Sequence, residues 1–583
     1  MQKIEVVAPR SRPIPLTFVL LVAAAVHAPL LLMKLPLKSY DTNFHIFFAS
    51  HYLSHWFDPW NTKWYAGFSQ TTYPPLAQQW VAIVSRLVGL DMAYMLVQFL
   101  SVLLLVVGIY RFSRLWVDQR AAALAALGAV FLGSETFLIY NAGQLSTTSA
   151  APLYVNGLAY LYEWIRRGTF RSFLKGIALT AAAAAVHHAT LLFGSLLFAI
   201  PVVWVALKDR QRDETASAAG FWTRVVTAVI IAGAAIAVVL APFWIALYNY
   251  PVTQTPIPHP SRANYLLSPE TGINYFLVPY GALILAFPFI LSRGASAIRL
   301  RPLLFTFWIA FILGLGGTTF AGRLVLGRAF EVLTMERFTY WATLLALPFV
   351  GLLAEELIAR FRMRAAVALG VAASLTCGMA LWWSANHQPD SMNFDVDSVA
   401  AWLNRDGHDR YRYVTLGFGN KIARLSVLTD AGSVDGEWNS GRMLPELTQY
   451  GVGALTSAKY FGAPGIDSLR AMLRHADRYG LKWVFCRDPY YEPLLVFAGW
   501  RKTDSLDDRT ISVWGKDDVP PATPLNLPNM PPAWHGLAWG LLPIGSSILA
   551  ILLVLIPGPR AVAGPVAQPE KQDKDLVLGR MIS

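Results

Sequence analysis

Apolar residues in this chain fall into runs of about 20, the length that an α-helix needs to cross the hydrocarbon layer of a membrane. The runs recur from about residue 15 to about residue 384, and one more lies near the C-terminus. Hydrophobic residues make up 55% of the chain and charged residues only 14%, which excludes an ordinary soluble protein. The pattern predicts a polytopic α-helical membrane protein with about twelve transmembrane helices.

The basic residues predict the orientation, because lysine and arginine concentrate in cytoplasmic loops. The clusters at 111–120, 166–175 and 208–212 fall on one side only if Leu76–Leu90 is an interfacial helix, and if the long run Ile177–Leu207 turns near His187 and His188. Both termini then lie in the cytoplasm of a multi-pass protein of the plasma (inner) membrane. The net charge of +12 reflects this bias and does not indicate a nucleic-acid partner.

The composition changes near Asn386, where charge, glycine and short β-prone segments become frequent. The segments Tyr413–Leu416, Lys482–Phe485 and Thr510–Trp514 are predicted strands, and Ser468–Tyr479 has helical periodicity. We therefore expect four parts: a transmembrane domain (1–385) that contains the first outer loop (34–91), an extracytoplasmic α/β domain (386–532), a last transmembrane helix (533–557) and a disordered cytoplasmic tail (558–583).

The first outer loop carries the most informative residues, Tyr40-Asp41-Thr42-Asn43-Phe44-His45. Asp41 and His45 are four residues apart and would share one face of a helix. Asp41 is a candidate general base that takes a proton from an acceptor while a sugar leaves a lipid phosphate. It also precedes a predicted helix that an aspartate would cap. His45, His51 and His55 suit either a metal site or a hydrogen-bonding belt at the membrane interface.

Other candidate residues lie at the outer ends of predicted helices. Glu135 is the candidate second carboxylate, because an ionisable group at membrane depth needs a partner or a polar cavity, although a neighbouring helix or the interface would also satisfy it. Asn141 and Gln144 can contact sugar hydroxyls or close a tight turn. Further candidates for substrate contacts are His187, His188 and Tyr73.

Arginines occur in one outer segment where the positive-inside bias should remove them. Arg323, Arg328 and Arg337 are candidates for binding the phosphate of a lipid carrier, with Glu336 beside them. Ordinary contacts with lipid headgroups and arginine–glutamate pairs are the alternatives.

Several motifs are missing from the chain: it has no phosphate-binding loop, no quartet of zinc ligands and no G-x-S-x-G element. ATP-driven transport and serine hydrolysis therefore lose support. A lipid or polysaccharide transporter or flippase remains an alternative, although it would need ionisable groups in mid-membrane. A non-catalytic subunit of an envelope-assembly complex is another alternative.

The first-loop elements Asp41, Phe44-His45, Pro59-Trp60 and Tyr73-Pro74-Pro75-Leu76, together with Glu336-Arg337-Phe338, resemble the GT-C class of integral membrane glycosyltransferases over roughly residues 14–385. That class includes protein O-mannosyltransferases, aminoarabinose transferases and oligosaccharyltransferases. Within it, the chain looks most similar to bacterial and archaeal membrane proteins labelled 6-pyruvoyl-tetrahydropterin-synthase-related, although nothing in the residues supports a pterin enzyme.

The resemblance implies a catalytic Asp41, a polyprenyl-phosphate-linked sugar as donor, and a glycan, lipid or protein acceptor on the extracytoplasmic side. It leaves open whether a divalent cation takes part, because only some members of the class use one. The first loop departs from the pattern of adjacent Asp-Glu, so a second acidic residue must come from elsewhere, and Glu135 is the candidate. In the predicted outer domain, Trp438 and Trp483 are candidate sugar platforms.

Overall fold

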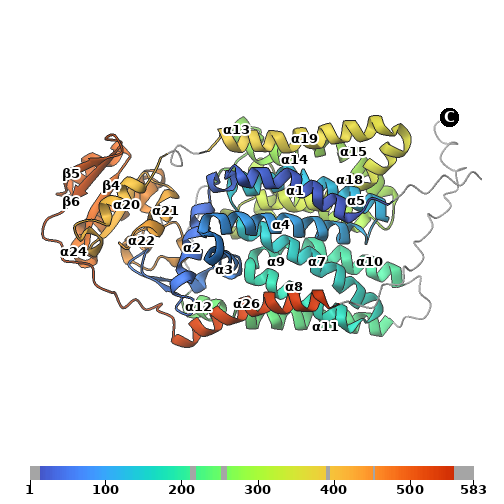
Figure 1. Cartoon of the computed structure of the whole chain (residues 1–583), viewed down its shortest axis with the longest axis horizontal. Coiled ribbons are helices and arrows are strands. Elements are labelled where there is room, and N and C mark those ends of the chain that lie inside the picture. The colour runs from blue at the N-terminus through green and yellow to red at the C-terminus, as the bar shows by residue number, and fades with distance from the viewer. Residues whose placement is uncertain (1–12, 211–217, 251–258, 389–393, 451–452, 557–583) are drawn as a thin grey trace, which may run out of the picture.

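The structure, a computed structural model, describes residues 13–210, 218–250, 259–388, 394–450 and 453–556. The predicted tail at 558–583 lies outside the described residues. Long, roughly parallel helices form a bundle, and a smaller region with a β-sheet lies at one end of it (Figure 1). We call this smaller part the sheet region and define it as residues 394–529.

Within the described residues up to Tyr250, the first half of the bundle and its connections contain twelve α-helices and a short antiparallel ribbon. The helices are α1 (Leu16–Leu32), α2 (Thr42–Ser54), α3 (Leu76–Val88), α4 (Leu90–Ser113), α5 (Gln119–Val130), α6 (Gly133–Phe137), α7 (Leu145–Arg167), α8 (Phe170–Val186), α9 (His188–Gly194), α10 (Ile200–Arg210), α11 (Ala218–Val239) and α12 (Ala241–Asn249). The ribbon strands are β1 (Trp60–Asn61) and β2 (Phe68–Ser69).

The second half of the bundle contains eight further α-helices among the residues that the structure describes, and the last of them follows the sheet region in sequence. They are α13 (Pro269–Gly272), α14 (Val278–Tyr280), α15 (Phe287–Ser296), α16 (Arg301–Gly314), α17 (Ala321–Leu326), α18 (Glu336–Phe361), α19 (Met363–Asn386) and α26 (Ala533–Leu555).

Eight helical segments of the described chain are long and apolar enough to cross a membrane, and two shorter apolar helices, Leu16–Leu32 and Arg301–Gly314, accompany them. The predicted total of twelve stays a prediction. Helix α7 is not among the eight, although it lies within the bundle: most of it is buried, including the polar run from Ser146 to Ser149. Because its neighbours are helices and not lipid, α7 needs less apolar character than a lipid-facing span.

The predicted turn near His187 is observed. Helix α8 ends at Val186, His187 is in an extended conformation, and α9 begins at His188. The chain then runs back along the bundle, because Asp209 near the end of α10 accepts a hydrogen bond from Tyr162 near the end of α7. This reversal brings His187 and His188 to the same end of the bundle as the sheet region.

The sheet region is built on a four-stranded mixed sheet of order β3-β4-β6-β5. Strands β3 and β4 are parallel, and the other two pairs are antiparallel. The elements are β3 (Arg412–Leu416), β4 (Leu481–Cys486), β5 (Arg501–Leu506), β6 (Ile511–Gly515), α20 (Asp397–Leu403), α21 (Lys421–Leu428), α22 (Pro445–Thr448), α23 (Gly462–Arg474), α24 (Ala476–Tyr479) and α25 (Glu492–Phe497). Three strands match the predicted segments. Edge strand β5 was not predicted, because its residues are mostly polar and its first half is exposed.

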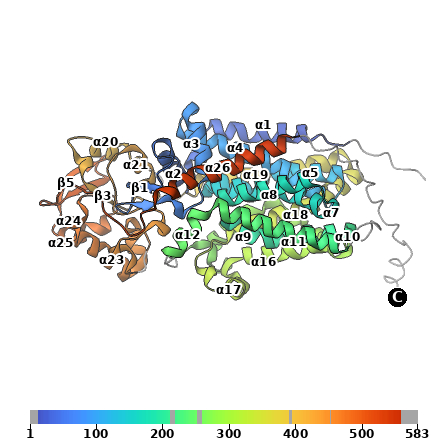
Figure 2. The same cartoon turned by 90° about the horizontal axis from the view of Figure 1, so that it is seen from below.

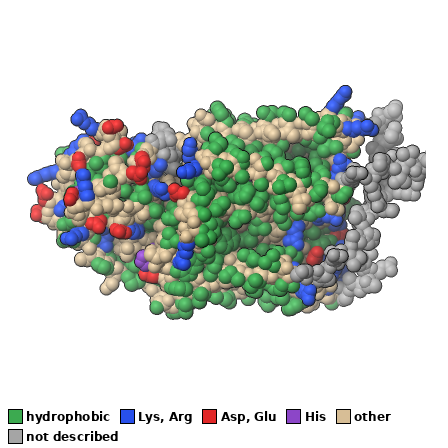
Figure 3. All heavy atoms as spheres, viewed as in Figure 1, with side chains coloured by type: hydrophobic (Ala, Val, Ile, Leu, Met, Phe, Trp, Pro, Cys, Tyr) green, Lys and Arg blue, Asp and Glu red, His purple; other side chains and the backbone are tan. Residues whose placement is uncertain are grey.

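Side-chain chemistry divides the surface in the same way (Figure 3). Hydrophobic side chains cover the bundle, whereas charged side chains gather on the sheet region and at the opposite end of the bundle. A membrane layer around the apolar surface leaves the sheet region in water. The two cysteines, Cys377 in the bundle and Cys486 in the sheet region, are both buried and free.

The first loop lies between the bundle and the sheet region and is bonded to both. The indole of Trp64 is fully buried and donates to Ser426 Oγ (2.9 Å), and the amide of Ser433 donates to the Lys63 carbonyl (2.7 Å). Helix α26 supports the loop from the bundle side, because its carbonyl oxygens at Trp539 and Gly540 accept from Gln79 (2.9 Å) and Trp56 (3.0 Å).

Candidate functional site

Asp41 lies directly before α2, where the first loop meets the connection between α5 and α7. The amide of Tyr40 donates to the Asn141 carbonyl, and the amide of Asp41 donates to the Ala142 carbonyl, each at 2.9 Å. Gly143 follows in the left-handed conformation (φ +72°), and a Cβ there would lie 2.7 Å from Ser39 Oγ and 3.0 Å from the Asp41 nitrogen. This close approach places the Asp41 backbone against the turn.

The carboxylate of Asp41 is not used as a helix cap. Asp41 occupies the N-cap position of α2, yet its side chain makes no hydrogen bond to the first turn. Burial raises the pKa of Asp41 to about 7, the nearby positive charge of Arg337 opposes that rise, and Glu336 adds to it. Asp41 is therefore a half-buried carboxylate that can gain or lose a proton near neutral pH.

Gln144 connects Glu336 and Arg337 at the start of α18. Its amide nitrogen donates to Glu336 Oε1 (2.9 Å), and its amide oxygen accepts from Arg337 Nε (3.4 Å) and from Thr147 Oγ1 (3.2 Å). A carboxylate can only accept and a guanidinium can only donate, so this pairing determines which way the amide of Gln144 points. The structure thus brings together Asp41, Gln144, Glu336 and Arg337, all of which the sequence indicated.

Aromatic side chains form a wall beside the same carboxylate. The hydroxyl of Tyr73 donates to Ser146 Oγ (3.0 Å), and burial raises the pKa of Tyr73 to about 12, so the hydroxyl is neutral. The Trp438 ring, from the sheet region, lies 4.9 Å from the Tyr73 ring and 5.7 Å from that of Phe44. Trp483, the other predicted platform, packs instead against Trp402 inside the sheet region.

His45 connects α2 to the element that closes the first loop. Its Nδ1 lies 2.9 Å from the amide of Gln78. With the amide oriented so that its oxygen accepts from His45, the amide nitrogen donates to the carbonyls of Pro74 and Pro75. Burial lowers the pKa of His45 to about 3, so the ring is neutral. These contacts give His45 a positioning role for Tyr73 and for the start of α2.

His187 and His188 lie on the Arg337 side of the site. The ring of His187 bonds to Thr190 Oγ1 (2.7 Å), and the ring of His188 packs against Phe243. The charge of Arg337 acts on both histidines. His259, which the sequence analysis did not single out, is also within electrostatic reach of Glu336 and Arg337.

Three predicted site residues are not brought to Asp41. Glu135 is buried in the bundle beside Tyr340, about two helical turns before Ala142. Arg323 and Arg328 are exposed on and after α17, which projects from the side of the bundle in Figure 2, and Arg323 pairs loosely with Glu331 at 3.9 Å. Two other acidic residues interact electrostatically with Asp41: Glu336 raises the pKa of Asp41, and Asp41 raises the pKa of Glu437.

Glu437 was missed because nothing in its local sequence indicates a site. It lies in a loop of the sheet region, far along the chain from Asp41. The residue beside it, Trp438, was the only sequence signal in that loop.

The described residues do not form a metal site of their own. Within those ranges there is no group of three or more His, Cys, Asp or Glu side chains that could hold a metal ion. His51, one of the predicted ligands, bonds to the Asp58 carbonyl (2.7 Å) and stacks on His55. The divalent cation that the resemblance left open stays a prediction.

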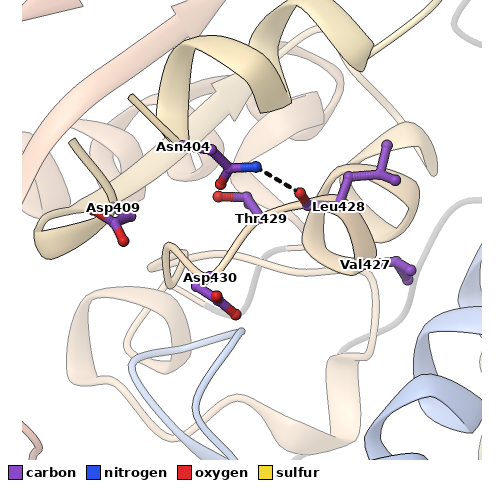
Figure 4. A pocket seen from close by; sticks show the side chains of 6 residues that line it. All are labelled: Asn404, Asp409, Val427, Leu428, Thr429 and Asp430. Carbon is purple, nitrogen blue, oxygen red and sulfur yellow. Dashed lines mark hydrogen bonds between the residues drawn. The ribbon is translucent and has the colours of Figure 1, made fainter. Parts of the chain in front are cut away.

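A separate hollow of about 280 Å³ lies in the sheet region (Figure 4). The residues that line it are Asn404, Asp409, Val427, Leu428, Thr429 and Asp430. Lys63 of the first loop reaches its rim, where it bonds to the Thr429 carbonyl and to Asp430. None of the residues grouped around Asp41 lines this hollow, so the two are distinct.

Comparisons with known proteins agree with this architecture at the level of the fold. No protein-family model matches the chain, and no curated protein sequence matches it. Among solved structures, the chain is similar to the Archaeoglobus fulgidus oligosaccharyltransferase tethered to an acceptor peptide (TM-score 0.52, 12% identity, covering 83% of this chain and 70% of that one).

Two further solved structures show the same likeness. ArnT from Cupriavidus metallidurans bound to undecaprenyl phosphate has a TM-score of 0.51 and 14% identity, with 87% of this chain and 100% of that chain covered. The arabinofuranosyltransferase AftD from Mycobacteria has a TM-score of 0.51 and 14% identity, with 86% and 40% covered. These neighbours are GT-C glycosyltransferases, and the more specific resemblance to pyruvoyl-tetrahydropterin-synthase-related proteins stays a prediction. The chain therefore has the fold of the GT-C membrane glycosyltransferases.

Proposed function

We propose that this protein is a membrane glycosyltransferase that moves a sugar from a polyprenyl-phosphate-linked donor to an acceptor at the extracytoplasmic face of the membrane, with Asp41 as general base. The observation that carries the proposal is the position of Asp41. It is a half-buried carboxylate, free of any capping bond, within electrostatic reach of Arg337, which donates to Gln144, and Gln144 in turn donates to Glu336.

The geometry supports a division of roles within the transfer step. Asp41 takes the proton from an acceptor hydroxyl or amine as that atom forms a bond to the anomeric carbon of the sugar. The bond between the anomeric carbon and the phosphate oxygen breaks, and its electron pair leaves with the polyprenyl phosphate. Arg337 stabilises the negative charge that develops on the phosphate, and Gln144 orients Arg337.

Two further observations support a lipid-linked donor. Helix α2, which Asp41 directly precedes, lies at the end of the apolar bundle next to the sheet region (Figure 1), and that end would border the polar headgroups of a membrane around the bundle. The fold is also shared with a protein whose solved structure holds undecaprenyl phosphate.

The test uses the full chain in nanodiscs with a panel of polyprenyl-phosphate sugars, and it follows the release of polyprenyl phosphate. Wild type should release it from at least one donor, and Asp41→Asn should reduce the rate at least a hundredfold, the range that a lost general base covers. Asp58→Asn is the matched control, because Asp58 is an exposed aspartate of the same loop and should keep wild-type activity. Equal turnover by wild type and Asp41→Asn would overturn the assignment, and binding without turnover would favour a transporter.

A further inference from the structure

The sheet region carries one more carboxylate, Glu437, within electrostatic reach of Asp41. Glu437 belongs to a loop that is bonded to the first loop at several points: Ala66 N–H donates to the Ser433 carbonyl (3.2 Å), Trp438 N–H to the Tyr65 hydroxyl (2.9 Å) and Trp438 Nε1–H to Thr72 Oγ1 (2.9 Å). Gly436 lies so close to the Trp64 ring that a Cβ would be 2.5 Å from it. The position of Glu437 is therefore determined by the docking of the sheet region on the first loop.

The same loop lies over the start of α2. The Trp438 ring packs against Phe44, three residues after Asp41, and Asn420 of the sheet region donates to the Tyr40 carbonyl (2.8 Å). Asp41 and Glu437 act on each other electrostatically, and both act on Tyr40. Burial, Asp435 and Asp41 raise the pKa of Glu437 to about 8, with Arg442 opposing, as expected for carboxylates that share a confined space.

Asp41 thus has two different sides. Arg337, Gln144, Glu336 and the histidines His187 and His188 lie on the bundle side, where the guanidinium of Arg337 can bind an anionic phosphate. Glu437 and Trp438 lie on the sheet-region side, where a second anion would meet two carboxylates. Carboxylates accept hydrogen bonds from hydroxyl and amine groups, and an indole ring packs well against the C–H face of a sugar.

We propose that Glu437 is an acceptor-binding residue, and that the acceptor is a polyhydroxylated molecule, neutral or amine-bearing near its reacting group. This inference rests on the proposed glycosyl transfer and adds the chemical class of the acceptor. In the assembled site, a hydroxyl next to the reacting one donates to Glu437, while the reacting hydroxyl gives its proton to Asp41. Negatively charged acceptors are excluded by repulsion from the two carboxylates.

The experiment uses the full chain in nanodiscs with a donor that the wild type turns over, at pH 9, where both carboxylates are ionised. The acceptors are three octyl glycosides of similar size: a glucoside, a glucosaminide with a free amine and a glucuronide. Wild type should transfer sugar to the first two at least tenfold better than to the glucuronide. Glu437→Gln should raise the KM for the glucoside at least tenfold and reduce kcat by a smaller factor. It should also reduce the ratio of the transfer rate to the glucoside over the transfer rate to the glucuronide.

Two further variants distinguish a role of Glu437 in acceptor binding from a general loss of structure. Glu437→Asp keeps the charge and should recover discrimination against the glucuronide. Asp508→Asn is the matched control: Asp508 is exposed at the β5–β6 turn with φ +48°, a conformation that asparagine also adopts, and this variant should match wild type.

The outcomes separate this proposal from the proposed function. A glucuronide preference, an unchanged KM in Glu437→Gln, or release of the sugar to water with none of the three glycosides accepted would overturn the acceptor assignment while leaving donor turnover intact. Absence of donor turnover in the wild type would instead count against glycosyl transfer itself.

Discussion

The backbone amide of Asp41 donates a hydrogen bond to the carbonyl oxygen of Ala142 across 2.9 Å. This bond joins the first loop to the connection between α5 and α7, which also supplies Gln144. Asp41, the proposed base, and Gln144, which contacts Arg337, are therefore positioned by one turn of the backbone, and Gly143 is at the centre of that turn. Changes to the turn should affect catalysis more than they affect folding.

Gly143→Ala tests this relationship. Alanine in the left-handed conformation costs roughly 1–3 kcal/mol, and here the added Cβ would also press on Ser39 and on the amides of Thr42 and Asp41. We expect donor turnover to fall at least tenfold. Gly168→Ala is the matched control, because Gly168 has nearly the same backbone angles (φ 73°, ψ 21°, against 72° and 27°). Its Cβ would meet mainly the flexible side chain of Arg224. We expect both variants to lower the unfolding temperature by a similar amount, while only Gly143→Ala loses activity. An equal loss of activity in the two variants would contradict this expectation.

The transfer rate should depend on the protonation of Asp41. Its pKa is raised to about 7 mainly by burial, and only the ionised form can take a proton, so the rate should fall about tenfold per pH unit as pH drops below about 7. Arg337→Gln removes a positive charge that lowers this pKa, so the acid limb should move to higher pH. Glu336→Gln removes a negative charge that raises it, so the limb should move to lower pH. Transfer rates measured across pH at saturating donor give the position of this acid limb. Shifts in the same direction for both variants would contradict the proposed roles of Arg337 and Glu336.

Gln144 should control donor binding through Arg337. Gln144→Met keeps the approximate size of the side chain but removes its hydrogen bonds, and it leaves the buried oxygen of Glu336 without its amide donor. We expect a loss of about 1–3 kcal/mol in stability and a rise of about tenfold in the KM for the donor. Gln119→Met, at an exposed position of α5, should change neither quantity. Steady-state kinetics and thermal unfolding in the same nanodiscs measure both effects.

The contact between Gly436 and Trp64 should govern the docking of the sheet region. Gly436→Ala would place a Cβ 2.5 Å from the indole, whereas Gly432→Ala, in the same loop, would meet its nearest atom, the Thr62 carbonyl, at 3.1 Å. The first variant should lose at least tenfold in transfer to an acceptor, and the second should lose much less. Adding Trp64→Phe to Gly436→Ala makes room for the Cβ and should restore part of the transfer. Failure of this pair to restore any transfer would argue against steric displacement.

The sequence could predict a helix that faces lipid, since such a helix must be apolar along its length. The turn at His187 was also predictable, because the run around it is too long for one span. Helix α7 shows the limit of this reasoning: its polar face is buried against other helices, and hydropathy alone does not distinguish it from a connecting segment. Strand β5 was missed for a related reason, because an exposed edge strand lacks an apolar face.

The site could be predicted in part. Five of the predicted residues lie at or next to helix ends at one end of the bundle, and the predicted topology put them at the same end: Asp41, Tyr73, Gln144, Glu336 and Arg337. Topology predicts the end of the bundle at which a residue lies, but not its position across the bundle. Arg323 and Arg328 were therefore predicted in the segment before α18, but they lie away from Asp41. The position of Glu135 along the bundle axis could not be predicted from the sequence. Helix α5 ends at Val130, and a break in the helix separates it from α6, which carries Glu135. The Glu437 contact depends on how the sheet region docks, which no local pattern encodes.

The bonds from α26 to the first loop have a consequence for the order of synthesis. Asp41 emerges early from the ribosome, Glu437 emerges much later, and the carbonyls of Trp539 and Gly540 that hold Gln79 and Trp56 come last of all. A nascent chain that has inserted its first helices therefore carries the base without its neighbouring carboxylate and without the support of the final helix. On the proposed mechanism, translation products that lack α26 should not turn over a lipid-linked donor, because the contacts that hold the first loop are complete only after Trp539 and Gly540 have been made.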